Sequence, residues 1–157
     1  MQKWLFIGFI FVGVISCTPK KSGSVFIDPS ISVADTIVYE ALIHNTDVSE
    51  TWKSDWLKGL DKEKLVNQLF ESIYNKKVKV VDYDTKVPMT TEQVQEWESN
   101  NPRSAIGKLQ FTETWGWDVH EGRFLKRVIA ILPAYEAFNE DGSLRGYKAG
   151  IQVLTNN

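Results

Sequence analysis

RFLKRVIAIL, residues 123–132, is the stretch that decides the fold, because it is apolar at every position from Val128 to Leu132. A strand of this composition needs cover on both faces, as a central strand has, so it is the best core candidate in the chain. Pro133 follows directly. Since proline has no N–H to donate, it must lie at a bulge, at an edge or at the end of the strand.

Two turns and two further strands flank this stretch. The preceding strand starts at Lys108 and includes Trp117, and His120–Gly122 turns the chain back at the tip of a hairpin. Asn139–Gly142 supplies the second turn, in which a glycine takes a positive φ without strain, and Tyr147–Leu154 forms the last strand. The sequence therefore predicts a three-stranded antiparallel meander.

The segment before the meander is predicted to begin with helices. The spacing of apolar residues predicts one helix over Ser32–His44 and a short one around Trp52–Leu57. Asp61 is a good N-cap for a third helix, Lys62–Tyr74, because its carboxylate accepts from the first free backbone amides. The apolar residues that share one face of the first helix are Ile37, Val38, Ala41 and Leu42.

One strand and a last short helix complete this part of the chain. Alternation predicts a half-buried strand over Lys77–Asp84, and Thr90 with Gln93 fits a capping box for a helix that continues to Glu98. The predicted fold class is therefore α+β, with N-terminal helices packed on a mainly antiparallel sheet that ends in the three-stranded meander.

Composition narrows the classes of function. The chain has 157 residues, of which 43% are hydrophobic, and this suits one globular domain. A formal net charge of -2 gives no attraction for nucleic acid, and a single cysteine rules out an internal disulfide. Two histidines far apart in the sequence argue against a histidine-rich metal site.

The N-terminus has the pattern of an export signal. Lys3 precedes the apolar run Trp4–Ile15, which is too short to span a bilayer and is typical of a secretory signal peptide. The run ends in Val14-Ile15-Ser16-Cys17, which resembles the bacterial lipobox. That resemblance implies acylation of Cys17 and cleavage before it. An uncleaved signal anchor with a buried structural cysteine is the alternative.

Lipidation at Cys17 divides the chain into a signal peptide at 1–16, a polar tether at 17–24 and a single domain at 25–157. Each buried CH₂ of an acyl chain contributes about 0.8 kcal/mol, so two or three chains hold a protein at a membrane almost permanently. Thr18 is not an aspartate, so analogy with inner-membrane retention rules places the protein at the outer membrane. No acidic run follows Cys17, which favours the periplasmic face.

Few residues point to catalysis. The sequence after Cys17 has no phosphate-binding glycine loop, no Gly-x-Ser-x-Gly elbow and no paired histidines, so we expect no enzyme, no cofactor and no metal site. His120 with Glu113 or Asp118 is the remaining acid/base candidate, and it ranks last. His120 lies at the predicted hairpin tip, where a charged residue is normally just solvated.

Trp115 and Trp117 are the candidate contact residues for a partner or ligand. They share one face of the predicted strand, so both can stack on a sugar or a peptide. They are equally suited to cover the sheet where a helix packs, and burial of so large a side chain favours that role.

The pattern of elements resembles the GldN/PorN family of the type IX secretion and gliding-motility machinery. The similarity covers about residues 60 to 155 and rests on structural motifs. They are the amphipathic helix Leu65–Tyr74, the Lys/Val strand Lys77–Asp84, the aromatic strand Phe111–Asp118, the apolar strand Val128–Pro133, and the turn and strand Asp141–Tyr147. The chain departs from the family in being shorter and in carrying a lipidation signal of its own.

The resemblance implies a non-enzymatic periplasmic subunit that binds a lipoprotein of the GldK/PorK type and helps build a ring, an oligomeric assembly, under the outer membrane. We therefore expect a lipid-anchored structural or adaptor protein that uses an exposed sheet edge or its aromatic face to hold an envelope protein. A small-ligand or glycan-binding lipoprotein with an aromatic surface is the alternative.

Overall fold

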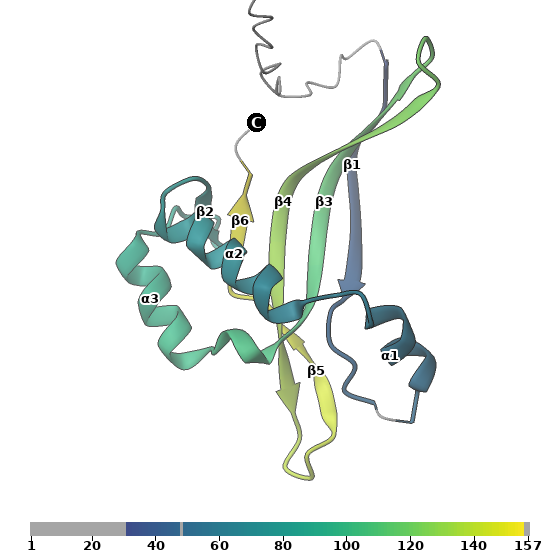
Figure 1. Cartoon of the computed structure of the whole chain (residues 1–157). Helices are drawn as coiled ribbons and strands as arrows, with labels where there is room; N and C mark the ends of the chain where they lie inside the picture. Colours follow the sequence, from purple (N-terminus) through teal and green to yellow (C-terminus); the bar gives the residue numbers. More distant parts are fainter. Residues whose placement is uncertain (1–30, 48, 156–157) are drawn as a thin grey trace, which may run out of the picture.

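The computed structural model describes residues 31–47 and 49–155, in which six strands form one antiparallel sheet accompanied by three α-helices (Figure 1). The sheet order is β1-β3-β4-β6-β2, and β5 also pairs with β4. The strands are β1 (Ser32–Leu42), β2 (Lys79–Asp82), β3 (Ile106–Asp118), β4 (Arg123–Phe138), β5 (Leu144–Lys148) and β6 (Ile151–Leu154). The helices are α1 (Thr51–Leu57), α2 (Lys62–Tyr74) and α3 (Thr91–Asn100), and a short 3-10 helix spans Arg103–Ala105.

The first described element is a strand, so the predicted α+β arrangement of N-terminal helices on a sheet is wrong. Of the predicted helix Ser32–His44, residues Ser32–Leu42 form β1, which pairs antiparallel with β3 from Ser32 opposite Gly116 to Leu42 opposite Lys108. The segment is rich in β-branched side chains, which lose rotamer freedom in a helix and pack well on a pleated surface. The fold is mostly sheet, and its short helices lie between β1 and β3 in the sequence.

The central strand is confirmed, but the predicted meander is not. β4 lies between β3 on one side and β6 and β5 on the other. The last predicted strand, Tyr147–Leu154, is divided into β5 and β6, which pair with different parts of β4. At the break, Trp97 packs so closely over Gly150 that an added Cβ would overlap the indole ring.

Pro133 lies where β4 changes partner on its outer edge. β6 pairs with Ala130 and Ile131, and β5 pairs with β4 from Tyr135 onward. The Ile129 carbonyl accepts from the Thr155 amide at 3.1 Å. Backbone groups alternate between the two edges of a strand, so those of Pro133 point to the same edge of β4 as the Ile129 carbonyl. The N–H that proline lacks would therefore lie in the gap between β6 and β5, where no partner needs it.

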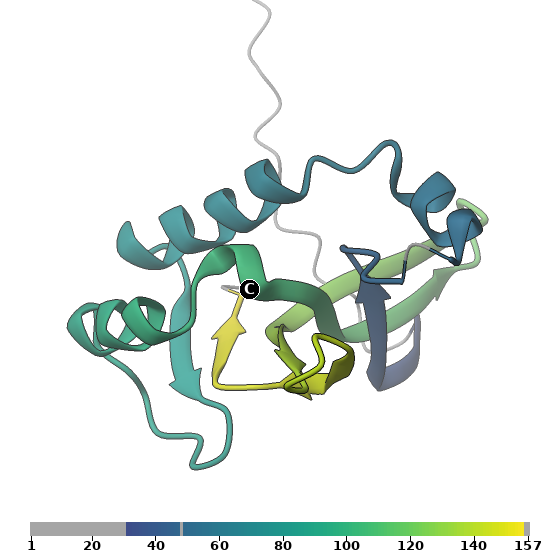
Figure 2. The same cartoon turned by 90° about the horizontal axis from the view of Figure 1, so that it is seen from below.

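Local signals place α2 and α3 as predicted. The Asp61 carboxylate caps α2 by accepting from the Lys64 amide at 2.9 Å. Thr90 and Gln93 form the reciprocal capping box of α3. α3 lies beside β2, and α2 runs from β2 past β6 and across β4, as Figure 1 and Figure 2 show. They therefore leave the outer part of the β3–β4 hairpin uncovered (Figure 1).

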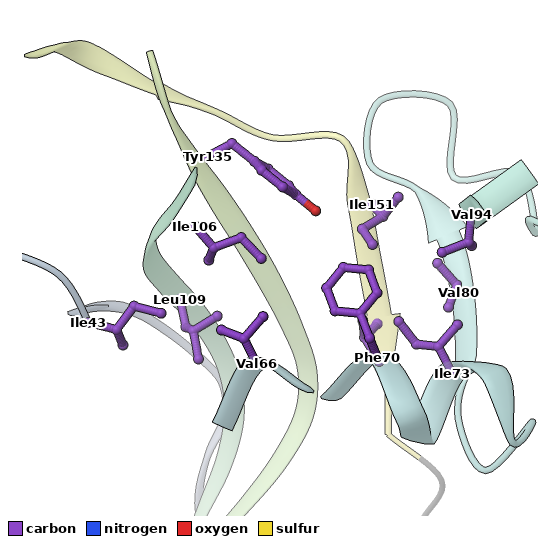
Figure 3. Packing of buried hydrophobic residues seen from close by; sticks show 11 residues of the cluster. Ile43, Val66, Phe70, Ile73, Val80, Val94, Ile106, Leu109, Tyr135 and Ile151 are labelled. Atoms are coloured by element: carbon purple, nitrogen blue, oxygen red, sulfur yellow. The ribbon is translucent and has the colours of Figure 1, made fainter. Parts of the chain in front are cut away.

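The core lies between these helices and the sheet. Figure 3 shows Phe70 pointing from α2 toward the strands, and its side chain is fully buried. Tyr135, also fully buried, contributes from β4, and burial raises the pKa of its hydroxyl to about 12. The buried cluster consists of Ile43, Val66, Phe70, Ile73, Val80, Val94, Ile106, Leu109, Tyr135, Ile151 and Val153.

Candidate functional site

The candidate site is an arm of three strands that extends beyond the helices. It consists of β1, the end of β3 from Phe111 to Asp118, and the start of β4 from Arg123 to Val128 (Figure 1). β1 is the last strand of the sheet on this side. Its outer edge therefore has no strand partner among the described residues.

Cross-strand register brings five aromatic side chains to one face of the arm. Tyr39 lies opposite Phe111 in the β1–β3 pair, and Trp117 lies opposite Phe124 in the β3–β4 pair. The Tyr39 and Phe111 rings stack with centroids 5.5 Å apart, and Phe124 contacts Trp115 edge-on at 5.3 Å and Trp117 at 6.2 Å. We call Tyr39, Phe111, Trp115, Trp117 and Phe124 the aromatic ladder.

A buried carboxylate, Glu113, holds the middle of this ladder together. The Tyr39 hydroxyl donates to Glu113 Oε1 at 2.8 Å, and the Trp115 indole N–H donates to Oε2, also at 2.8 Å. The Lys126 ammonium lies 3.3 Å from Oε2 and sits over the Tyr39 and Trp115 rings, 5.1 and 5.0 Å from their centroids. Buried charges are tolerated when they are paired and hydrogen-bonded in this way.

The electrostatics of the pair favour the ionised carboxylate. Burial by itself would raise the pKa of Glu113, but the hydrogen bonds from Trp115 and Tyr39 and the charge of Lys126 outweigh it and hold this pKa below its usual range. Burial and the hydrogen bond to Glu113 raise the pKa of the Tyr39 hydroxyl. Both carboxylate oxygens of Glu113 thus have partners: Tyr39 for Oε1, and Trp115 and Lys126 for Oε2.

The two predicted contact residues have different surroundings. Trp115 is half-buried in the ladder, and its N–H is used by Glu113. Trp117 and its partner Phe124 are each 46% exposed. Trp115 therefore stabilises the arm from within, and the exposed part of Trp117 is open to contact with another molecule.

The histidine candidate is not assembled into a site. His120 is exposed at the β3–β4 turn, where its backbone N–H donates to Asp118 Oδ1 at 3.0 Å. Backbone donation from Glu121 and His120, together with Arg123, holds the pKa of Asp118 below its usual range against a small effect of burial. The Glu113 carboxylate is bound by Tyr39, Trp115 and Lys126 and not by His120. The structure thus uses Asp118 to close the turn and does not bring the three side chains to one cleft.

A second buried carboxylate was missed by the sequence reasoning. Glu136 Oε1 lies 2.7 Å from His44 Nδ1, and the two residues are 92 positions apart. A Cβ at Gly107 would overlap the Glu136 side chain, and the Gly107 carbonyl accepts from the amides of Ile43 and His44. The one signal for this close approach is the glycine itself, which lies just before the predicted start of the strand at Lys108 and is inside the observed β3.

One cavity of the described residues lies apart from the aromatic ladder. It has a volume of about 590 Å³ and lies between the end of α2, β2 and the start of α3, and no residue of the aromatic ladder lines it. The described part of the chain contains no group of three or more His, Cys, Asp or Glu side chains placed to hold a metal ion. No helix within it is long and apolar enough to cross a membrane.

The predictions for the N-terminus remain predictions. The signal peptide at 1–16, the tether at 17–24 and the lipidation residue Cys17 lie outside the described residues, as does the start of the predicted domain. No family model matches the chain, and no curated protein is significantly similar to it in sequence.

Proposed function

We propose that this chain is a lipid-anchored structural or adaptor subunit on the periplasmic face of the outer membrane, where it holds another envelope protein. In keeping with the GldN/PorN resemblance, the partner is a lipoprotein of the GldK/PorK type. The anchor is Cys17, and the arm is the contact surface.

The observation that carries this proposal is the open outer edge of β1. The strand runs for 11 residues, and its backbone donors and acceptors on this edge face no other described strand. Val38, near its middle, is 53% exposed. An unpaired edge with exposed apolar side chains is suited to accept a strand from a partner, because backbone hydrogen bonds supply affinity and side chains supply specificity.

The aromatic ladder makes this edge a better docking site than an isolated strand. Glu113 and Lys126 tie β1 to β3 and β4 through Tyr39, so the edge is held in place before a partner arrives. Less conformational entropy is then lost when the partner binds. The side chain of Trp115 contributes to this rigidity.

The test is recovery of the complex under mild extraction. The full chain, labelled with palmitate in cells and solubilised in mild detergent, should carry the label at Cys17 and co-purify with a large envelope complex. Val38→Lys should lower the co-purified partner about tenfold, because an edge lysine opposes strand pairing. Val87→Lys is the matched control, since Val87 is similarly exposed but lies outside the arm. Recovery of only free monomer from the unmodified chain would contradict the proposal.

A glycan-binding lipoprotein is the second candidate, favoured by the exposed rings of Trp117 and Phe124. Such a surface can stack on sugars. Quenching of tryptophan fluorescence by soluble cell-wall fragments, lost in Trp117→Ala and retained in Trp56→Ala, would favour this function over the adaptor.

A further inference from the structure

The far end of the arm exposes apolar side chains that the partner-binding edge does not use. We call Trp117–Phe124 the tip. Val119 in its turn is 69% exposed, and Trp117 and Phe124 lie side by side behind it with much of their rings open. The tip stands clear of α2 and α3 in Figure 1, so it can meet a flat surface without hindrance from the helices.

The N-terminal side of the chain meets the arm beside the tip. Ser32, the first residue of β1, is paired with Gly116, which immediately precedes Trp117. Figure 1 shows β1 starting next to the outer end of the β3–β4 hairpin. A chain fixed to lipid at Cys17 therefore enters the described structure at the same end as the tip.

The covalent distance allows direct contact with the bilayer. About 15 residues separate Cys17 from Ser32, and an extended chain of that length spans about 50 Å at most. The other exposed tryptophans, Trp52 and Trp56 on α1, follow the opposite end of β1, and a strand of this length covers about 35 Å. Compared with the α1 tryptophans, the tip thus lies nearer to Ser32, where the tether side of the chain joins β1.

Charges at the tip favour neutral lipid over an anionic surface. Asp118 is occupied by the turn amides and lies 3.5 Å from Arg123, so these two charges offset each other. Glu121 adds a negative charge, and His120 is the remaining titratable residue of the tip. Binding must then come from apolar contact, with an indole ring at the level where tryptophan is enriched in membrane proteins.

We propose that the tip inserts Val119, Phe124 and Trp117 into the headgroup side of the lipid leaflet that holds the anchor at Cys17. This inference rests on the lipid anchor of the proposed function. It assigns Trp117 to lipid and leaves the β1 edge for the partner protein. With two points of attachment, the anchor and the tip, the arm stands on the membrane in a fixed direction.

The test uses the full lipidated chain with one added thiol. Acylation leaves Cys17 no free thiol, so Val119→Cys can be labelled selectively with a polarity-sensitive fluorophore. Glu140→Cys, in the exposed β4–β5 turn, is the matched control. Each labelled protein is reconstituted into vesicles of zwitterionic phospholipid without any other protein. Flotation reports the anchor, and the emission maximum and quenching by iodide report the label.

The tip proposal requires both proteins to float with the vesicles. Only the label at position 119 should show a blue shift and at least about fivefold protection from iodide, because it lies in the lipid layer. Anionic lipid should not increase this difference. Flotation with both labels equally open to iodide overturns the tip proposal and leaves the anchor intact. Failure to float overturns the anchor and the tip with it. Protection at position 119 that arises only when the envelope partner is added would assign the tip to protein instead of lipid.

Discussion

The two halves of the β3–β4 hairpin have the same backbone pairing but are stabilised in different ways. In the body, next to α2 and α3, Ile106 and Tyr135 are opposite each other and fully buried. In the arm, Trp117 and Phe124 are also opposite each other, and nearly half of each side chain is exposed. The body depends on apolar burial, and the arm depends on a network around one carboxylate. Strand composition alone does not tell these halves apart, because the difference lies in what covers them.

The largest expected effect is in the body. Phe70→Ala should lower the free energy of unfolding by about 3–5 kcal/mol, because Phe70 is fully buried in the centre of the core and its loss leaves a cavity. Phe124→Ala is the matched change in the arm and should cost about 1 kcal/mol, since that ring is half-exposed. Urea denaturation of both variants measures the difference. Equal losses would remove the distinction between body and arm.

A methyl group at Gly107 tests the close approach of β3 to the Glu136 side chain. Gly107→Ala should cost about 2 kcal/mol, because the new Cβ would overlap Glu136 and displace it from His44. Gly59→Ala is the control, since a Cβ there meets no atom within 4 Å. Denaturant midpoints compare the two. An unchanged midpoint for Gly107→Ala would mean that the carboxylate has room to move aside.

Neutralising Glu113 should loosen the arm and leave the body intact. Glu113→Gln removes the ion pair with Lys126 and weakens the hydrogen bonds from Tyr39 and Trp115, at a cost of about 1–2 kcal/mol. Amide hydrogen exchange should quicken at Thr114 and stay unchanged at Leu109. Glu121→Gln, at the exposed turn, controls for the loss of a charge. Faster exchange along the whole strand would show that the halves are not independent.

Acid should produce the same loosening to a smaller degree. The pKa of Glu113 in the folded protein lies below its ordinary value of 4.5, so its contribution to stability is complete above that value and is lost as the pH falls through the lowered pKa. The Trp115 indole N–H resonance, followed by NMR from about pH 6 to about pH 3, should broaden as the carboxylate is protonated. In Glu113→Gln this dependence should be absent. A Trp115 resonance that is insensitive to acid in the unmodified chain would contradict the assigned role of Glu113.

The predictable parts of the fold are those with local signals. Asp61 and the Thr90–Gln93 pair cap helices within a few residues of themselves, and the central strand is visible as an unbroken apolar run. β1 was predicted incorrectly because its helix-like spacing of apolar residues is also compatible with an edge strand, and the choice depends on β3, some 70 residues away. Tertiary pairing overrides such weak local preferences.

The candidate site was predictable only in its most conspicuous residues. Trp115 and Trp117 stand out in the sequence, and their common face follows from strand alternation. The role of Glu113 depends on side chains from three strands, with Tyr39 lying 74 positions away from it. The pairing of His44 with Glu136 likewise has no local pattern. Long-range polar contacts of this kind leave no periodic pattern in the sequence, so sequence patterns do not predict them.

Pro133 also acts as a stop for strand sliding. If β6 or β5 shifted along β4, one of its carbonyl groups would lie opposite the Pro133 nitrogen, which has no N–H to donate. Each misaligned pairing would therefore lose one backbone hydrogen bond. Pro133 thereby helps to fix the register of both β5 and β6 on β4. Correct assembly of the C-terminal segment is favoured by a penalty on its alternatives, without any added attraction in the native state.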